Sequence, residues 1–469
     1  MAKVKRLDPA VMGVHVGTLS GRSRDHVYLQ HRDGVIVHGP TGSGKTWRLA
    51  YQLTCGAPGF TLATTTKADL LSATLCDRAD KGRVAVFDPE DLTGWPASIR
   101  WSILAGCDDP DTAIRRAAAL ARAMPLEGTK NGGYFEGKAS VLLRCYLFAA
   151  AVGGYSVRDL RVWVSSRSTR TAVDILEAEL PDWAAELTQI LDSGSDSSDD
   201  VVAAAARLLD PLASPKLLNA VDVPPAESFD VESFVLNGAN TLYAVSKGTS
   251  KSMSPFVAAL VAEAHYFADR QSQRLPGKRL DPPARFVLDE MNNVAPLPDL
   301  PTIMTDSGGR GITVWAFAHN QMQNEMRWGT TGGQVLSESA PAMLVLPGLR
   351  GERELASLSR LLGNRKAWQI SHGAGGVSHQ LHEEAILTPA QIRGLATDDG
   401  LLLYRNAPAM VVHLPTVWQD KRTKKAVQAS MAEFDEIVAS RKVPERYRPE
   451  GSSAQVCAVE FRDQAAMGW

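Results

Sequence analysis

The sequence has no excess of basic residues, no paired cysteines and no long uninterrupted apolar segment. Its 469 residues include 50 Lys and Arg against 52 Asp and Glu, which gives a formal net charge of -2. This balance excludes a protein that binds nucleic acid or a membrane through its overall charge, so any site for a polyanion must be local. The five cysteines are odd in number and widely spaced, with no CxxC pair, which is typical of reduced thiols in a cytosolic protein.

The apolar segments are too short for a membrane span. The longest, Val141–Val152, is interrupted by Arg144, whereas a helix needs about 20 apolar residues to cross a bilayer. The first residues carry positive charges without the apolar stretch of a secretory signal. We therefore expect a soluble, cytoplasmic chain of ordinary globular composition.

Seven short apolar or β-branched runs are candidate strands, and helical patterns separate most of them. They are Gly34–His38, Phe60–Thr64, Val84–Phe87, Thr241–Val245, Phe286–Asp289, Thr313–Phe317 and Ala342–Leu346. Several are apolar on both faces, as strands buried in a parallel sheet are. The alternation predicts an α/β fold in which helices cover the faces of a mainly parallel sheet.

Alanine-rich helical patterns replace the strand signals between the third and fourth candidate strands. We interpret residues 109–221 as an all-α domain inserted into a discontinuous sheet domain, residues 1–108 and 222–414. Residues 415–469 are polar and predict one helix followed by a loose tail. The tract 192–200 could be an acidic functional segment, but small polar residues before an apolar helix are more typical of a loop and cap.

The most specific motif is a GxxxxGK[ST] phosphate loop between a candidate strand and a helical pattern. It comprises Gly39, Pro40, Thr41, Gly42, Ser43, Gly44, Lys45 and Thr46. The glycines let backbone N–H groups turn towards phosphates, Lys45 reaches the β and γ oxygens, and Thr46 binds magnesium. The alternative is a chance glycine turn, which the strand–loop–helix context disfavours. We predict that these residues bind ATP and Mg2+.

An acidic pair follows the fifth candidate strand. Asp289 would hold Mg2+ at the carboxyl end of this strand, and Glu290 would act as general base towards the attacking water. An acidic turn that closes a buried strand is the alternative. The complete phosphate loop earlier in the chain favours the catalytic interpretation, which makes the protein an ATPase.

An arginine on a glycine-flanked loop comes next. Arg310 could reach the γ-phosphate of a neighbouring subunit as an arginine finger. From the spacing alone, an ordinary surface arginine is the better interpretation.

These motifs resemble those of the type IV coupling proteins, the hexameric DNA-pumping ATPases of bacterial conjugation and type IV secretion. The resemblance extends from about His26 to about Val412. Besides the phosphate loop, its carriers are Thr64–Leu71, Val86–Pro89, Arg100–Cys107, Leu288–Pro296, Ser307–Ile312, Gln323–Gly329 and Leu346–Gly363.

The resemblance implies a RecA-like P-loop domain, with the inserted segment as the all-α domain that meets the relaxase and the DNA. It also implies a homo-hexamer with nucleotide sites between subunits and Arg310 as the finger supplied in trans. Such a ring moves one DNA strand through its pore by gripping phosphates. Lys247 and Lys251 are candidates for this grip, although solvated loop lysines are an equal alternative.

The sequence departs from the family pattern at two places. His319 stands where members usually have a glutamine that senses the γ-phosphate; an imidazole can still donate one hydrogen bond. Members also typically begin with transmembrane helices that dock on the secretion channel. Either such an anchor has been removed, or this is a naturally soluble member that relies on a membrane partner. In function we expect it at the cytoplasmic face of the bacterial inner membrane.

Other interpretations stay open. Three histidines and a glutamate in a glycine-rich stretch could form a metal site, but the glycines favour a mobile loop; these residues are His372, His379, His382 and Glu383. For the function, we expect an ATP-driven translocase that delivers DNA with its relaxase to a type IV secretion channel. The alternatives are an FtsK-type translocase of double-stranded DNA and a non-motor ATP-binding adaptor for secretion substrates.

Overall fold

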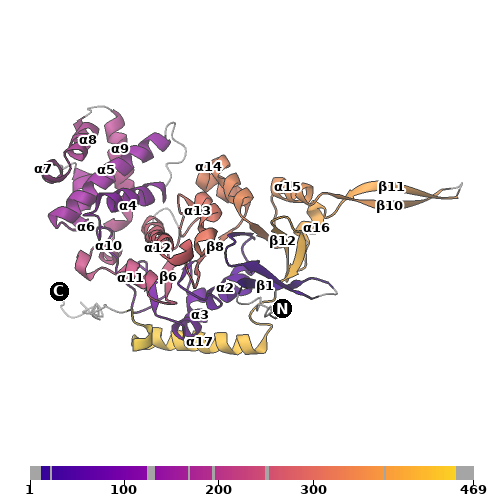
Figure 1. Ribbon diagram of the computed structural model, residues 1–469. Helices are drawn as coiled ribbons and strands as arrows, with labels where there is room; N and C mark the ends of the chain where they lie inside the picture. Colours follow the sequence, from indigo (N-terminus) through magenta and orange to yellow (C-terminus); the bar gives the residue numbers. More distant parts are fainter. Residues whose placement is uncertain are drawn as a thin grey trace, which may run out of the picture.

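The computed structural model describes residues 12–21, 24–123, 132–166, 170–192, 196–248, 253–373 and 376–449. Within these residues, an eleven-stranded sheet has the order β2-β1-β13-β12-β9-β3-β8-β7-β4-β6-β5. A second sheet holds only β10 and β11. Figure 1 shows helices on both sides of the large sheet and a group of helices beyond one end of it.

Seven neighbouring strands of the large sheet are parallel, and they are the seven that the sequence predicts. Their bounds are β3 Val35–His38, β4 Thr61–Thr65, β5 Val84–Phe87, β6 Thr241–Val245, β7 Ala284–Leu288, β8 Ile312–Ala318 and β9 Ala342–Val345. Nearly every residue in them is buried, as expected where helices cover both faces. The predicted α/β class is confirmed.

Four antiparallel strands that the sequence analysis missed extend this sheet. They are β1 Gly13–Leu19, β2 His26–Gln30, β12 Asp399–Tyr404 and β13 Met410–His413. Their burial is mixed, with exposed or half-buried positions in each strand. Such strands lack the continuous apolar run that marks the parallel ones.

Alternate residues of the parallel strands enter two separate hydrophobic cores. Phe286 and Leu288 of β7 belong to the first core, and Val287 between them belongs to the second. The helices that contribute to the first core include α12 Ser254–Arg274, α13 Leu300–Asp306 and α14 Gln321–Ser339. The second core includes residues of the helical segment Thr46–Ala50 and of α2 Tyr51–Cys55, α3 Asp69–Ala79 and α17 Lys421–Ser440. The long helix α17 lies along the lower edge of the molecule in Figure 1.

Helices alone occupy the described chain between β5 and β6, as the sequence predicts. They are α4 Pro110–Ala123, α5 Gly132–Gly153, α6 Val157–Ser166, α7 Arg170–Glu179, α8 Pro181–Asp192, α9 Asp196–Leu209, α10 Pro215–Val221 and α11 Val231–Leu236. Their apolar residues join the first core. A buried ion pair between Arg116 of α4 and Glu263 of α12, 3.0 Å apart, adds a polar contact to this packing. The exact division into domains stays a prediction.

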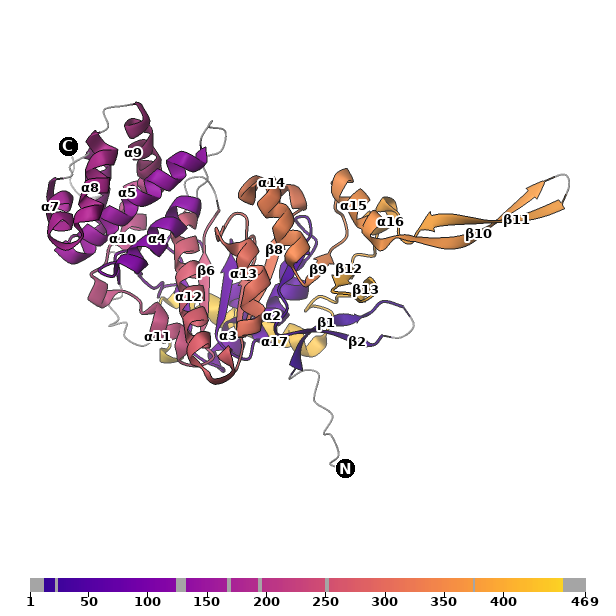
Figure 2. The same cartoon turned by 45° about the horizontal axis from the view of Figure 1, so that its top comes forward.

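A two-stranded ribbon projects from the end of the molecule opposite this helical group (Figures 1 and 2). It consists of β10 Asn364–Gly373 and β11 Gly376–Ala385 and follows α15 Glu352–Leu362; α16 Pro389–Arg393 comes after it. The prediction of a loop here is wrong, because the two halves pair in register up to Gly373 and Gly376. Arg365 and Glu384, 2.7 Å apart, add a cross-strand ion pair.

Further expectations from the sequence can be compared with the described residues. Among them, no helix is long and apolar enough to cross a membrane, and no group of three or more His, Cys, Asp or Glu side chains could hold a metal ion. The predicted C-terminal helix is α17, and the predicted tail lies largely beyond residue 449, outside the described residues.

Candidate nucleotide-binding site

The phosphate loop connects the buried strand β3 to the helical turns that begin at Thr46. Gly42 and Gly44 have φ angles of 82° and 83°, a left-handed conformation that suits glycine. At Gly44 a Cβ atom would also lie 2.8 Å from Nε of Arg48. Both glycines are therefore required by the backbone that the loop adopts.

Lys45 lies at the centre of the site. Its Nζ donates to the carbonyl oxygen of Gly39 at 2.7 Å and lies 3.3 Å from Nδ1 of His319 and 3.9 Å from Oε1 of Glu290. Burial lowers the pKa of Lys45, and the carboxylates of Glu290 and Asp289 partly offset this effect. The side chain thus contacts groups from three segments that are far apart in the sequence.

Asp289 follows β7 and faces the first helical turn. Its Oδ2 accepts a hydrogen bond from Oγ1 of Thr46 at 3.3 Å, while its buried Oδ1 has no partner among the described residues. Burial, reinforced by the charge of Glu290, raises the pKa of Asp289 to about 6. The hydroxyl oxygen of Thr46 and the carboxylate of Asp289, with its unpartnered Oδ1, are oxygen ligands of the kind that a divalent cation such as Mg2+ prefers.

Glu290 and His319 form a close pair beside Lys45. Nε2 of His319 lies 2.9 Å from Oε2 of Glu290. Burial raises the pKa of Glu290, but the hydrogen bond from His319 and the charge of Lys45 outweigh it, and the net shift is downward. With a proton on Nε2, His319 donates to Glu290 and accepts from Lys45. His319 is therefore in contact with the residue that the sequence analysis predicts as general base.

Two further features of the site were not singled out from the sequence. Oγ1 of Thr64, at the end of β4, donates to the carbonyl oxygen of Asp289 at 2.8 Å and fixes the backbone there. Glu290 itself has a φ of 54°, an uncommon conformation for a non-glycine residue. Neither feature has a local sequence pattern, since the first is a contact between distant strands and the second is a backbone angle.

Arg310 does not lie at this site within one chain. It ends a short helical turn before β8, whereas His319 follows β8 directly. Seven strand residues separate the two positions by about 20 Å. The guanidinium pairs with Asp269 and with Asp306, the latter at 2.5 Å. Any contact with a nucleotide would therefore need a second copy of the chain.

The two candidate DNA-gripping lysines follow β6. Lys247 lies just beyond the carboxyl end of this strand, and its backbone N–H donates to Oε1 of Glu90 at 3.4 Å. Lys251 lies outside the described residues. Their role stays a prediction.

The segment that contains Asp289 matches a known family model, and the fold matches solved structures. Residues 283–397, which include Asp289 and the segments after it, match a family model described as the TraM recognition site of TraD and TraG. Two solved structures of bacterial and plasmid coupling protein TrwB share the fold. The unbound form of TrwBdeltaN70 is 20% identical, with a TM-score of 0.62, 82% of this chain covered and 85% of that chain.

The second TrwB structure, in complex with the non-hydrolysable GTP analogue GDPNP, is also 20% identical. Its TM-score is 0.63, with 82% of this chain and 86% of that chain covered. The fold is therefore that of the TrwB coupling proteins, and the segment at residues 283–397 matches the recognition domain described for TraD and TraG. VirB4 of Thermoanaerobacter pseudethanolicus is a more distant match, at 13% identity and a TM-score of 0.50, over 88% of this chain and 98% of that one. No curated protein matches the sequence significantly.

Proposed function

We propose that this chain is a coupling protein of the type IV family, an ATPase that drives DNA into a type IV secretion channel during conjugation. One observation carries the proposal: the fold brings Lys45, Thr46, Asp289 and Glu290 together at the carboxyl ends of the parallel strands β3 and β7. The TrwB structures, among them complexes with nucleotide analogues and with ADP and Mg2+, support nucleotide and Mg2+ binding at this place.

Each residue has a distinct task in this proposal. The loop N–H groups and Lys45 bind the phosphates, and Lys45 exchanges its bonds to Gly39 and His319 for phosphate oxygens. Thr46 and Asp289 would hold Mg2+, which when bound neutralises charge on the phosphates. Glu290, kept ionised by its neighbours, accepts a proton from the attacking water. His319 orients the Glu290 carboxylate through their 2.9 Å contact.

A ring of subunits completes the site in this proposal. Arg310 is too far from its own phosphate loop, so we propose that it acts on the nucleotide of a neighbouring subunit in a hexamer. To do so it must leave Asp269 and Asp306. Those two carboxylates would then hold the guanidinium in place when no neighbour is present.

The partners follow from the family. We propose that the ring moves DNA, single-stranded in preference to double-stranded, and that the helices α4–α11 meet the relaxase. The domain matched at residues 283–397 supports a role in substrate or partner recognition at the secretion channel. We propose that the protein works at the cytoplasmic face of the inner membrane.

The experiment is an ATPase assay with single-stranded DNA, duplex DNA or none. The variant Glu290→Gln should bind ATP without turnover, whereas Glu177→Gln, an exposed glutamate in α7, serves as the matched control and should behave as the unmodified protein. A stronger response to duplex DNA would favour an FtsK-type translocase. Binding without turnover in the unmodified protein would favour the adaptor.

A further inference from the structure

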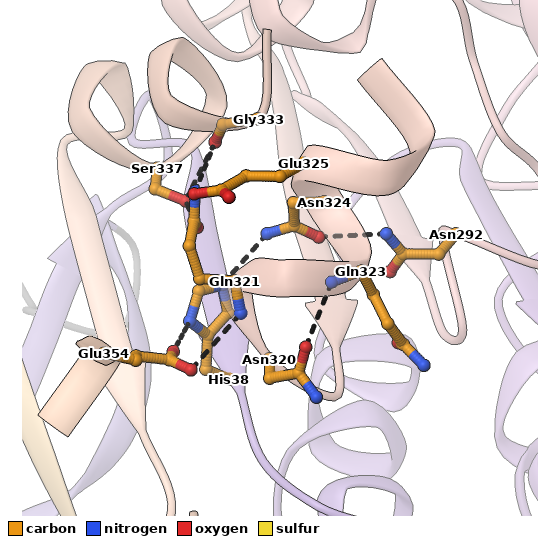
Figure 3. Close-up of polar contacts among 10 residues, drawn as sticks. All are labelled: His38, Asn292, Asn320, Gln321, Gln323, Asn324, Glu325, Gly333, Ser337 and Glu354. Atoms are coloured by element: carbon orange, nitrogen blue, oxygen red, sulfur yellow. Dashed lines mark hydrogen bonds and ion pairs between the residues drawn. The ribbon is translucent and has the colours of Figure 1, made fainter. Parts of the chain in front are cut away.

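A chain of polar side chains runs from Asn292 through Asn324 and His38 to Glu354 (Figure 3). At its centre is His38, the last residue of β3, which directly precedes Gly39 of the phosphate loop and is 1% exposed. Its Nδ1 lies 2.6 Å from Oε1 of Glu354 in α15, and its Nε2 lies 3.2 Å from Nδ2 of Asn324 in α14. Both ring nitrogens are therefore engaged.

The hydrogen bonds of this chain all run in one direction. Nδ2 of Asn292 donates to Oδ1 of Asn324 at 2.9 Å, and the Asn324 amide in turn faces Nε2 of His38 as a donor. With its proton on Nδ1, His38 accepts from Asn324 and donates to Glu354. Asn324 and His38, the two inner members, thus each use a donor and an acceptor, and such a satisfied network holds its parts in one arrangement.

Through Asn324, the polar chain reaches the two segments that carry Glu290 and His319. Asn292 is two residues after Glu290, in the turn where Glu290 adopts its positive φ. Asn324 is five residues after His319, and Oε2 of Glu354 also accepts from the backbone N–H of Gln321, at 3.3 Å. The chain therefore ties both segments to the strand that begins the phosphate loop.

No member of this chain forms a hydrogen bond or ion pair with Lys45, Thr46, Asp289 or Glu290 among the contacts of the described residues. It cannot take part in the reaction directly. We propose that His38 is a positioning residue that, through Asn324 and Glu354, sets Glu290 and His319 at their working distance from the phosphate loop. This inference rests on the proposed ATPase function.

The expected consequence is a loss of turnover at nearly unchanged nucleotide affinity. Affinity comes from the loop N–H groups and Lys45, which the His38 chain does not contact, whereas turnover depends on the placement of Glu290. A displacement of about 1 Å in a catalytic group can cost about 100-fold in rate. We expect His38→Phe to lower kcat by about 10- to 100-fold and to change the nucleotide Kd by less than about threefold.

A control on the same strand separates positioning from general destabilisation. Val37 is fully buried beside His38 but contacts the second hydrophobic core, so Val37→Ala perturbs β3 without touching the polar chain. Both variants are compared at a temperature at which circular dichroism shows them folded. An equal fall in kcat for both, or a loss in His38→Phe explained wholly by Kd, overturns the proposal.

A second experiment does not depend on the stability of His38→Phe alone. Asn292→Ala and Glu354→Gln change the two ends of the polar side-chain network, which are joined through His38 and Asn324. Their effects on kcat should be non-additive when His38 is present and additive in His38→Phe. Additive effects in the presence of His38 would refute positioning. If the unmodified protein shows no turnover, the proposed function fails instead.

Discussion

The pKa of Asp289 makes Mg2+ binding dependent on pH in a defined direction. Burial raises this pKa from 3.8 to about 6, which corresponds to a penalty of about 3 kcal/mol on the ionised form. In the metal-free protein, the favourable effect of the protonated Asp289 on the free energy of unfolding is complete below pH 3.8. This effect is lost as the pH rises through about 6, because the buried carboxyl must then ionise. Mg2+ needs the ionised carboxylate, so below pH 6 it must displace a proton.

We therefore expect the apparent affinity for Mg2+ and nucleotide to fall about tenfold for each pH unit below 6 and to level off above 7. Isothermal titration calorimetry in buffers of different ionisation enthalpy measures the protons released. At pH 5.5 about three-quarters of Asp289 side chains should carry a proton that Mg2+ displaces, and at pH 7.5 almost none.

The nucleotide's own terminal phosphate also releases protons, so the comparison with Asp289→Asn isolates the carboxylate. This variant should bind Mg2+ weakly and should not release the proton that Mg2+ displaces from Asp289 in the unmodified protein. Asp88→Asn is the matched control, because Asp88 is also a buried carboxylate after a parallel strand but is satisfied by Thr93 at 2.6 and 2.7 Å. Equal proton release by Asp289→Asn and the unmodified protein would refute the reasoning.

Two further predictions concern His319 and Arg310. His319→Ala removes a hydrogen bond that lowers the pKa of Glu290, so the acid limb of the pH–rate profile should move to higher pH. His319→Gln keeps a hydrogen-bond donor and should move this limb less. An acid limb that does not move in His319→Ala would contradict the contact between His319 and Glu290. Arg310→Ala should lower turnover by about 10³-fold or more. Mixing the Arg310→Ala protein with the equally inactive Lys45→Ala protein should restore activity, because some subunit interfaces then pair an intact Lys45 with an intact Arg310. If rings that are shown to exchange subunits recover no activity, Arg310 does not act in trans.

The parallel half of the fold could be predicted from the sequence because its strands are buried on both faces. Val84–Phe87 and Thr241–Val245 have the same bounds in the structure as in the prediction. The four antiparallel strands were missed, since a strand such as His26–Gln30 alternates exposed and buried residues over only five positions. The glycines at 373 and 376 were interpreted as signs of a loop, whereas they are the last paired residues of the two-stranded ribbon.

The site was predictable to the extent that its residues lie in contiguous motifs. The phosphate loop and the pair Asp289–Glu290 each follow a buried strand, so their meeting at one sheet edge follows from parallel topology. The contact of His319 with Glu290 was not predicted, because it depends on strand order. The chain from Asn292 through Asn324 and His38 to Glu354 joins four separate segments, and its members have no shared motif.

The central claim is that the chain is an assembling DNA-dependent ATPase. The most direct measurement is the steady-state ATPase rate against protein concentration, with and without single-stranded and duplex DNA, for the unmodified chain and Glu290→Gln. We predict turnover per subunit that rises with concentration and with DNA and is lost in the variant. Negligible turnover at every concentration despite measurable ATP binding, or a rate that survives in Glu290→Gln, would contradict it.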